Sequence, residues 1–185
     1  MKGYKLYFAV AVLLLLAVPL FGQAVSSTAT TPINVTRTES ISISVTTALP
    51  TLTIPAGSLN SDTQNVVVQS SWNLKQTRTN GVQICVSAVG ALAGVNSGTT
   101  GNNNTIPVNN IYVTPSGGSA TALGGATAVC GITGAVQFKN YPTTTAAQRN
   151  NPTGQSDTIP VQVKLAADVA ADSYTGTLNL TAYSN

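Results

Sequence analysis

The sequence predicts an all-β protein, an antiparallel β-sandwich that follows an N-terminal signal peptide. Three observations support this prediction: apolar residues recur at every second position in several short segments, turn-forming clusters separate those segments, and the polar residues are mostly uncharged. Of the 185 residues, 43% are hydrophobic and only 7% are charged, whereas an average soluble domain has about 25% charged residues. Because disorder requires low hydrophobicity and high charge, this composition indicates a folded domain.

The first 24 residues have the pattern of a secretory signal peptide. Lys2 and Lys5 supply positive charge, residues 6–16 are apolar, and Gly22 and Ala24 are small residues just before the expected cleavage site. A membrane anchor is the alternative, but an apolar stretch of about 16 residues is shorter than the roughly 20 that a spanning helix needs. We therefore expect a secreted or cell-surface protein that meets the membrane only during export.

Export also changes the charge balance. Eight Lys and Arg against five Asp and Glu give a formal charge of +3, and removal of Lys2 and Lys5 lowers it to +1. The basic character of the whole sequence therefore comes mostly from the signal peptide. A nucleic-acid partner would need a clustered basic face, and we expect none.

Cys85 and Cys130 are the only two cysteines in the sequence. Since an exported protein reaches an oxidising compartment, we expect a disulfide between them, worth roughly 4 kcal/mol in the chain-entropy model, with an intermolecular bond as the alternative. Cys85 alternates with the apolar residues of its segment, which places the bond on the outward side of the sheet or at its rim, partly accessible. The bond closes an excursion over residues 90–129 that is rich in Gly, Ala, Asn and Ser.

Apolar and polar residues alternate in several segments along the chain. Residues 41–45 alternate Ile or Val with Ser, and residues 51–54 continue after Pro50 as a second short strand. In the next segment Val66, Val68 and Trp72 share one face and are expected to form core, with a sugar-stacking role for Trp72 as the less favoured alternative. Further strands are expected over residues 82–86, 106–113, 159–165 and 174–182, a short helix over 144–149, and a helix or tight loop over 166–171.

The sequence lacks the residues that catalysis and metal binding use most. It has no His, which removes the usual proton shuttle at neutral pH and the commonest metal ligand. Two thiols alone leave zinc under-coordinated. Asp168 and Asp172 form a carboxylate pair only on a helix, and two solvated loop acids are the favoured interpretation. We therefore expect no enzyme, no cofactor and no metal site.

The two ends of the expected mature chain carry a further pattern. Residues 158–165 and then 172–183 form a closing strand pair, and residues 41–57 form an alternating segment ahead of the first long strand. This pattern resembles the spore coat protein U family, to which the pilins of archaic chaperone–usher pili belong. The family usually has cysteines where this chain has residues 48–50 and 70–72, none of which is Cys, so the disulfide is not carried over from the resemblance.

The resemblance implies a secreted structural subunit of a surface filament or coat, with an incomplete immunoglobulin-like (pilin-like) sandwich. In such a subunit the N-terminal strand of the next subunit fills the open groove. The implied division is residues 1–24 as signal peptide, 25–47 as N-terminal extension with the candidate donor strand, and 48–185 as sandwich. The candidate donor residues at the subunit interface are Ile41, Ile43 and Val45, with Ile33 and Val35 ahead of them. The implied partners are identical or related subunits, a periplasmic chaperone and an usher.

A self-complete secreted β-sandwich that acts as a binding module, an adhesin or a carbohydrate-binding domain, is the alternative. The two hypotheses differ at residues 38–46. These residues pair within their own chain in the self-complete sandwich, and they are free in a subunit that donates them.

Overall fold

The computed structural model describes residues 31–96, 104–166 and 169–184, and the chain divides into two units, residues 1–36 and 37–185. The expected signal peptide, residues 1–24, lies outside the described residues. Within the first unit, residues 31–36 are exposed and belong to no helix or strand. The second unit is the folded domain.

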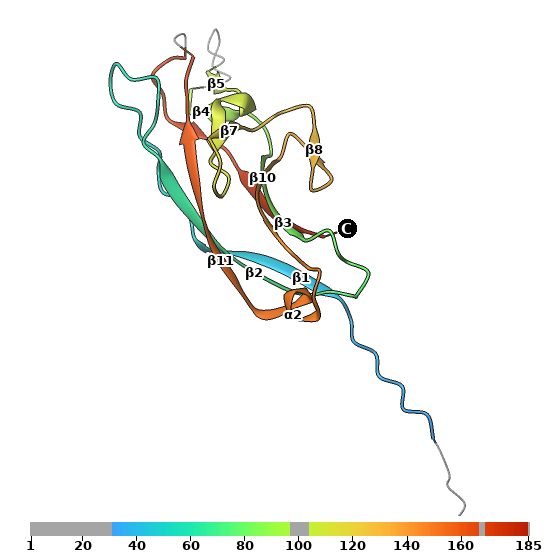
Figure 1. The fold of residues 1–185 in the computed structure, drawn as a ribbon. Coiled ribbons are helices and arrows are strands. Elements are labelled where there is room, and N and C mark those ends of the chain that lie inside the picture. Colours follow the sequence, from blue (N-terminus) through green and yellow to red (C-terminus); the bar gives the residue numbers. More distant parts are fainter. Residues whose placement is uncertain (1–30, 97–103, 167–168, 185) are drawn as a thin grey trace, which may run out of the picture. The chain divides into compact units, whose positions relative to one another are not determined.

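The folded domain is an antiparallel β-sandwich, as the alternating segments predict (Figure 1). One sheet has the order β1 (Ser40–Thr47), β2 (Gln64–Asn73), β11 (Asn150–Val163), β6 (Ile111–Val113) and β7 (Thr121–Ala122). The second has the order β10 (Val136–Tyr141), β3 (Val82–Ala88) and β13 (Leu178–Tyr183). Two small sheets join β12 (Tyr174–Thr175), β4 (Leu92–Gly94) and β5 (Thr105–Ile106), and β8 (Ala128–Val129) with β9 (Ile132–Thr133).

Among the described residues, the strand order is similar to that of an immunoglobulin-like sandwich without its strand G. In that fold strands A, B, E and D form one sheet and strands C, F and G the other. Here β1, β2, β11 and β6 take the order A-B-E-D, while β3 and β13 take the places of C and F. In the part of the chain that the structure describes, no strand pairs with the other edge of β13, where strand G would lie.

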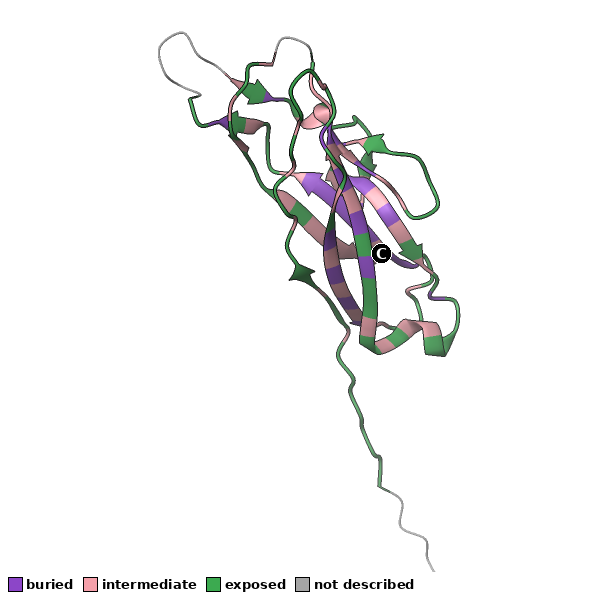
Figure 2. Cartoon of the chain, turned by 90° about the vertical axis from the view of Figure 1, so that its left-hand side faces the viewer, coloured by how far each residue is buried: buried purple, intermediate pink, exposed green. Residues whose placement is uncertain are grey.

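The core lies between the two sheets, and buried residues alternate with less buried ones along β2 and β10 (Figure 2). Val66, Val68 and Trp72 of β2 are 3%, 0% and 4% exposed. The indole N–H of Trp72 donates to the carbonyl of Gln148 at 2.8 Å, and the indole ring lies 5.2 Å from that of Tyr141. The Trp72 ring is therefore not available to stack on a sugar.

The expected disulfide between Cys85 and Cys130 is formed, but the expectation that it is partly accessible is wrong. Cys85 and Cys130 are only 1% and 6% exposed. Cys130 and Gly131 form the turn of the β8–β9 hairpin, both with positive φ as a type I′ turn requires. The disulfide holds this hairpin against β3, the central strand of its sheet. Alternation along one strand cannot show that a distant hairpin covers it.

Two other expected elements differ in the structure. The strand expected over residues 106–113 is divided, because the short 3-10 helix η1 (Val108–Asn110) follows Pro107 and separates β5 from β6. The expected helix is shorter, α2 (Ala146–Arg149), and begins with a capping box between Thr145 and Gln148. Of residues 166–171, positions 167 and 168 lie outside the described residues, and the others form no helix.

A charged cluster bridges the two sheets inside the domain. The Asp157 carboxylate on β11 is 4% exposed, accepts hydrogen bonds from the Tyr141 hydroxyl at 2.6 and 2.7 Å, and lies 3.2 Å from Lys139 Nζ. Burial, followed by the hydrogen bond to Asp157, raises the pKa of Tyr141. The pKa of Lys139 is also raised, foremost by its hydrogen bond with Tyr141.

Both raised pKa values make the domain sensitive to alkaline pH. The folded state holds these protons more tightly than the unfolded chain, so their contribution is fully present below the ordinary tyrosine pKa of 10.0 and is lost as the pH rises above it. We expect the urea midpoint of unfolding to fall between about pH 9 and about pH 11. The Tyr141→Phe variant, which has no phenolic proton to lose, should show a smaller fall; an equal fall in both proteins would contradict this assignment.

Candidate functional site

The candidate donor strand is paired within its own chain. Residues 41–45 form the centre of β1, and Ile41, Ile43 and Val45 lie directly opposite three buried residues of β2. Directly opposite residues of antiparallel strands point to the same face, so these three side chains face the core. This is the pairing that the self-complete sandwich predicts for residues 38–46.

The pairing nevertheless leaves these core-facing side chains only partly covered. Ile41 and Val45 are 37% and 50% exposed, and Ile43 is half-buried. By contrast Val68, which is opposite Val45 on the neighbouring strand, is 0% exposed. The sandwich is therefore open along β1, although β1 has a strand partner.

β13 shows the same property at the edge of the second sheet. Leu180 and Ala182 lie opposite Val86 and Ile84 of β3, which are both 0% exposed. Leu180 and Ala182 themselves are only half-buried, as is Leu178. β1 also lies close to β13, so the partly exposed core-facing residues of the two edge strands are neighbours, and we call this place the open seam. Its core-facing residues are Ile41, Ile43, Val45, Leu178, Leu180 and Ala182.

Two hydroxyl groups near the open seam also lack partners. Within the described ranges, the buried side-chain oxygens without a hydrogen bond are those of Ser70 and Ser184. Ser70 lies opposite Ile43, and Ser184 directly follows β13. A buried hydroxyl without a partner costs about 1–3 kcal/mol, so the interior beside the seam is less well satisfied than the rest of the core.

The chain that follows β1 was expected to form a second short strand over residues 51–54, but residues 48–55 belong to no strand. Leu52 and Ile54 are half-buried and pack against the core. Between them Thr53 exchanges two hydrogen bonds with Asp62: the Thr53 N–H donates to the carboxylate at 2.7 Å, and the Thr53 carbonyl accepts from the Asp62 N–H at 3.0 Å. This segment is thus fixed by one loop residue and not by a neighbouring strand.

The N-terminal extension presents apolar side chains of its own. Ile33 and Val35 are each 86% exposed, the highest exposure of any large hydrophobic residue that the structure describes. They are two positions apart, so in an extended strand both point to one face.

The acidic residues of the described ranges lie apart from one another. These ranges contain no cluster of three or more His, Cys, Asp and Glu that could hold a metal ion. Asp172 accepts hydrogen bonds from Asn96, Asn104 and the Ser173 N–H, which together lower its pKa. Asp168, the other member of the carboxylate pair, lies outside the residues that the structure describes. Among the helices of the described ranges, none is long and apolar enough to cross a membrane.

Comparison of the chain with models of known protein families found no match, and comparison with curated proteins found none either. The resemblance to the spore coat protein U family therefore remains a prediction from the sequence.

Proposed function

We propose that this protein is a secreted structural subunit of a surface filament or coat, and that it assembles by strand donation between copies. The observation that supports the proposal is the open seam at the position of strand G. A strand that enters the seam pairs with the free main-chain groups of β13 and covers core-facing side chains of both sheets.

In this proposal the donor is the N-terminal extension of another copy, residues 25–36, and Ile33 and Val35 are its apolar anchors. Full burial of each side chain stabilises the complex by roughly 1.5–3 kcal/mol, in addition to the main-chain hydrogen bonds. Ile41, Ile43 and Val45, which the sequence suggested as donor residues, then contribute to the wall of the acceptor. Related subunits, a periplasmic chaperone and an usher are the further partners that the resemblance implies.

The residues between the extension and β1 favour donation to another copy over insertion into the same chain. Residues 36–39 contain no Gly, Pro or Asn, the residues that favour a tight turn and would help the chain fold back on itself. Arg37 donates to Asn150 at 2.7 Å, and the Thr38 carbonyl accepts from Asn73 at 3.0 Å. These bonds fix the chain at the ends of β2 and β11.

The second candidate is the self-complete secreted binding module. The observation that favours it is the pairing of β1 with β2 in one chain. That pairing leaves the six apolar residues of the open seam only partly covered, and we therefore favour the subunit.

The test of the proposal is the assembly of the mature protein. The wild type should form linear particles in electron micrographs, and its mass by light scattering should grow with concentration. A variant without residues 25–36 should stay folded, because residues 31–36 contribute no strand to the domain, and it should be monomeric. A wild type that is monomeric at every concentration would contradict the proposal and support the self-complete module.

A further inference from the structure

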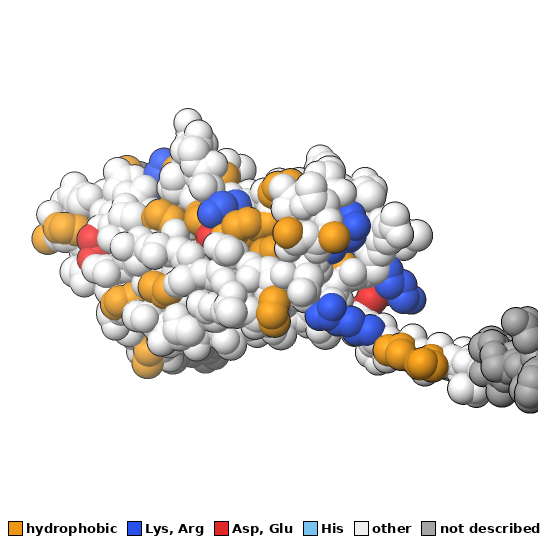
Figure 3. Space-filling view, turned by 60° about the horizontal axis from the view of Figure 1, so that its bottom comes forward, with side chains coloured by type: hydrophobic (Ala, Val, Ile, Leu, Met, Phe, Trp, Pro, Cys, Tyr) orange, Lys and Arg blue, Asp and Glu red, His pale blue; other side chains and the backbone are white. Residues whose placement is uncertain are grey.

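Positive charge gathers at one end of the folded domain, around a pocket of about 320 Å³. Of the six Lys and Arg that follow the signal peptide, Arg37, Lys75 and Arg149 line this pocket, and Arg78 joins them through Glu39. Figure 3 shows Lys and Arg side chains grouped in this way at one end of a surface that carries little other charge. The four cations come from three distant parts of the sequence. For this reason no run of basic residues in the sequence predicts the cluster.

Glu39 is the one acidic residue of the pocket lining, and its carboxylate is already paired with neighbouring groups. Its carboxylate lies 3.6 Å from Lys75 Nζ and 3.3 Å from Arg78 Nε, and it accepts the main-chain N–H of Lys75 at 2.9 Å. That main-chain bond is the largest cause of the lowered pKa of Glu39. One carboxylate thus faces four cations, and the pocket keeps a clear excess of positive charge.

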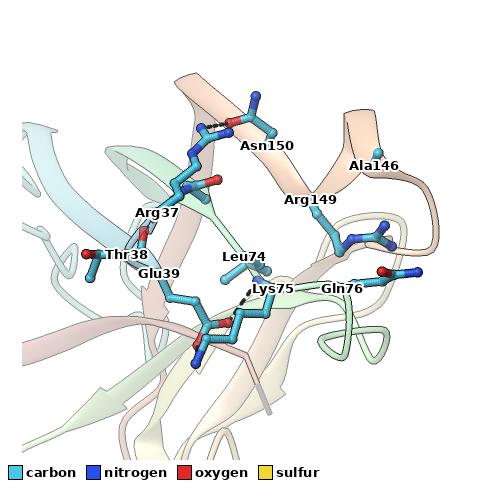
Figure 4. A pocket seen from close by; sticks show the side chains of 10 residues that line it. Arg37, Thr38, Glu39, Leu74, Lys75, Gln76, Ala146, Arg149 and Asn150 are labelled. Carbon is cyan, nitrogen blue, oxygen red and sulfur yellow. Dashed lines mark hydrogen bonds and ion pairs between the residues drawn. The ribbon is translucent and has the colours of Figure 1, made fainter. Parts of the chain in front are cut away.

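Arg37 and Arg149 are held in place by neutral groups. Arg37 donates to the side-chain oxygen of Asn150 at 2.7 Å, and Arg149 donates to the carbonyls of Thr143 and Thr144 at 3.0 and 2.9 Å. Neither guanidinium pairs with a carboxylate of the described residues. Figure 4 shows Arg37 at the left and Arg149 at the right of the pocket, with Glu39 and Lys75 lower in the view. Each guanidinium has five N–H donors, so both retain donors for a ligand.

We propose that this pocket binds an acidic saccharide, with the carboxylate of a uronic acid held by Arg37, Lys75 and Arg149. A guanidinium fork matches a carboxylate geometrically and gives a charge-assisted bond. The rest of the lining suits sugar hydroxyls, because Asn73, Gln76 and Asn150 offer amide donors and acceptors. The volume lies at the lower end of the range for small-molecule sites, about 300–1,000 Å³, which fits a short saccharide.

The probe for this site is digalacturonate, with neutral galactobiose and inorganic phosphate as comparison ligands. Calorimetric titration of the mature full-length chain at low salt should give one digalacturonate site per chain, weakened by added salt. Galactobiose should not bind. Phosphate binding that is as tight as digalacturonate binding and equally dependent on Arg37 would reduce the pocket to a simple anion site and overturn the saccharide assignment.

Variants locate the site. Arg37→Gln and Lys75→Gln should each weaken digalacturonate binding about tenfold, the effect of one charge-assisted hydrogen bond. Lys164→Gln is the matched control, because Lys164 lies over the Tyr112 ring, away from the pocket, and it should bind as the wild type does. Binding that is absent from the wild type, or unchanged in both pocket variants, would overturn the proposal. Because binding is counted per chain, this result does not depend on whether the protein assembles.

Discussion

Ile33→Asp should abolish assembly and leave the folded domain as stable as the wild type. In the free protein Ile33 is 86% exposed, so a carboxylate at this position costs the domain nothing. In the proposed assembly the same side chain enters the apolar seam of a neighbouring copy, and burial of an unpaired charge there is too costly for docking. Light scattering measures the loss of assembly, and the melting temperature should be unchanged.

Asn34→Asp is the matched control for this variant. It adds the same charge one residue further along, and successive side chains of a strand point to opposite faces, so this carboxylate stays outside the seam. We expect Asn34→Asp to assemble. If both variants lose assembly, charge repulsion between extensions explains the loss and the seam does not; if both assemble, Ile33 is not an anchor.

Trp72→Ala should lower the free energy of unfolding by about 3–5 kcal/mol. The substitution removes a side chain that is 4% exposed and its contact with Tyr141, and it leaves the Gln148 carbonyl without its indole donor. Urea unfolding followed by circular dichroism is the suitable measurement, because Trp72 is the only tryptophan.

Trp72→Phe separates the two contributions. It keeps most of the ring packing and loses the N–H donor, so its cost should be nearer to 1 kcal/mol, the value of one hydrogen bond. An unchanged urea midpoint for Trp72→Ala would show that the indole does not hold the two sheets together.

The parts of the fold that alternation predicts are those with one face against the core. Val66 and Val68 on β2, and Ile159 and Val161 on β11, are buried because every second side chain of each strand points inward. Alternation does not predict the structure where a proline interrupts a strand, or where a segment distant in sequence covers a residue. Pro107 interrupts one expected strand, and the hairpin that carries Cys130 buries a disulfide expected near the surface.

Only part of the open seam could be predicted from the sequence. Alternation indicates that β1 and β13 are strands with an apolar face, but it cannot show that both are edge strands or that their apolar faces remain partly exposed. Those properties follow from long-range pairing, of β1 with β2 and of β13 with β3. The basic pocket could not be predicted from the sequence for a related reason, since Arg37, Lys75 and Arg149 come together only after the sheet has formed.

The most direct test of the open seam is amide hydrogen exchange at β13. The measurement uses the variant without residues 25–36, alone and with a synthetic peptide of residues 25–39. We expect main-chain amides of Leu178–Tyr183 that do not bond to β3 to exchange rapidly in the variant alone. The wild-type peptide should slow their exchange, and the same peptide with Ile33→Asp should not. Amides of β13 that are already protected without the peptide, or that exchange at the same rate when it is present, would contradict the claim that another copy completes this sandwich.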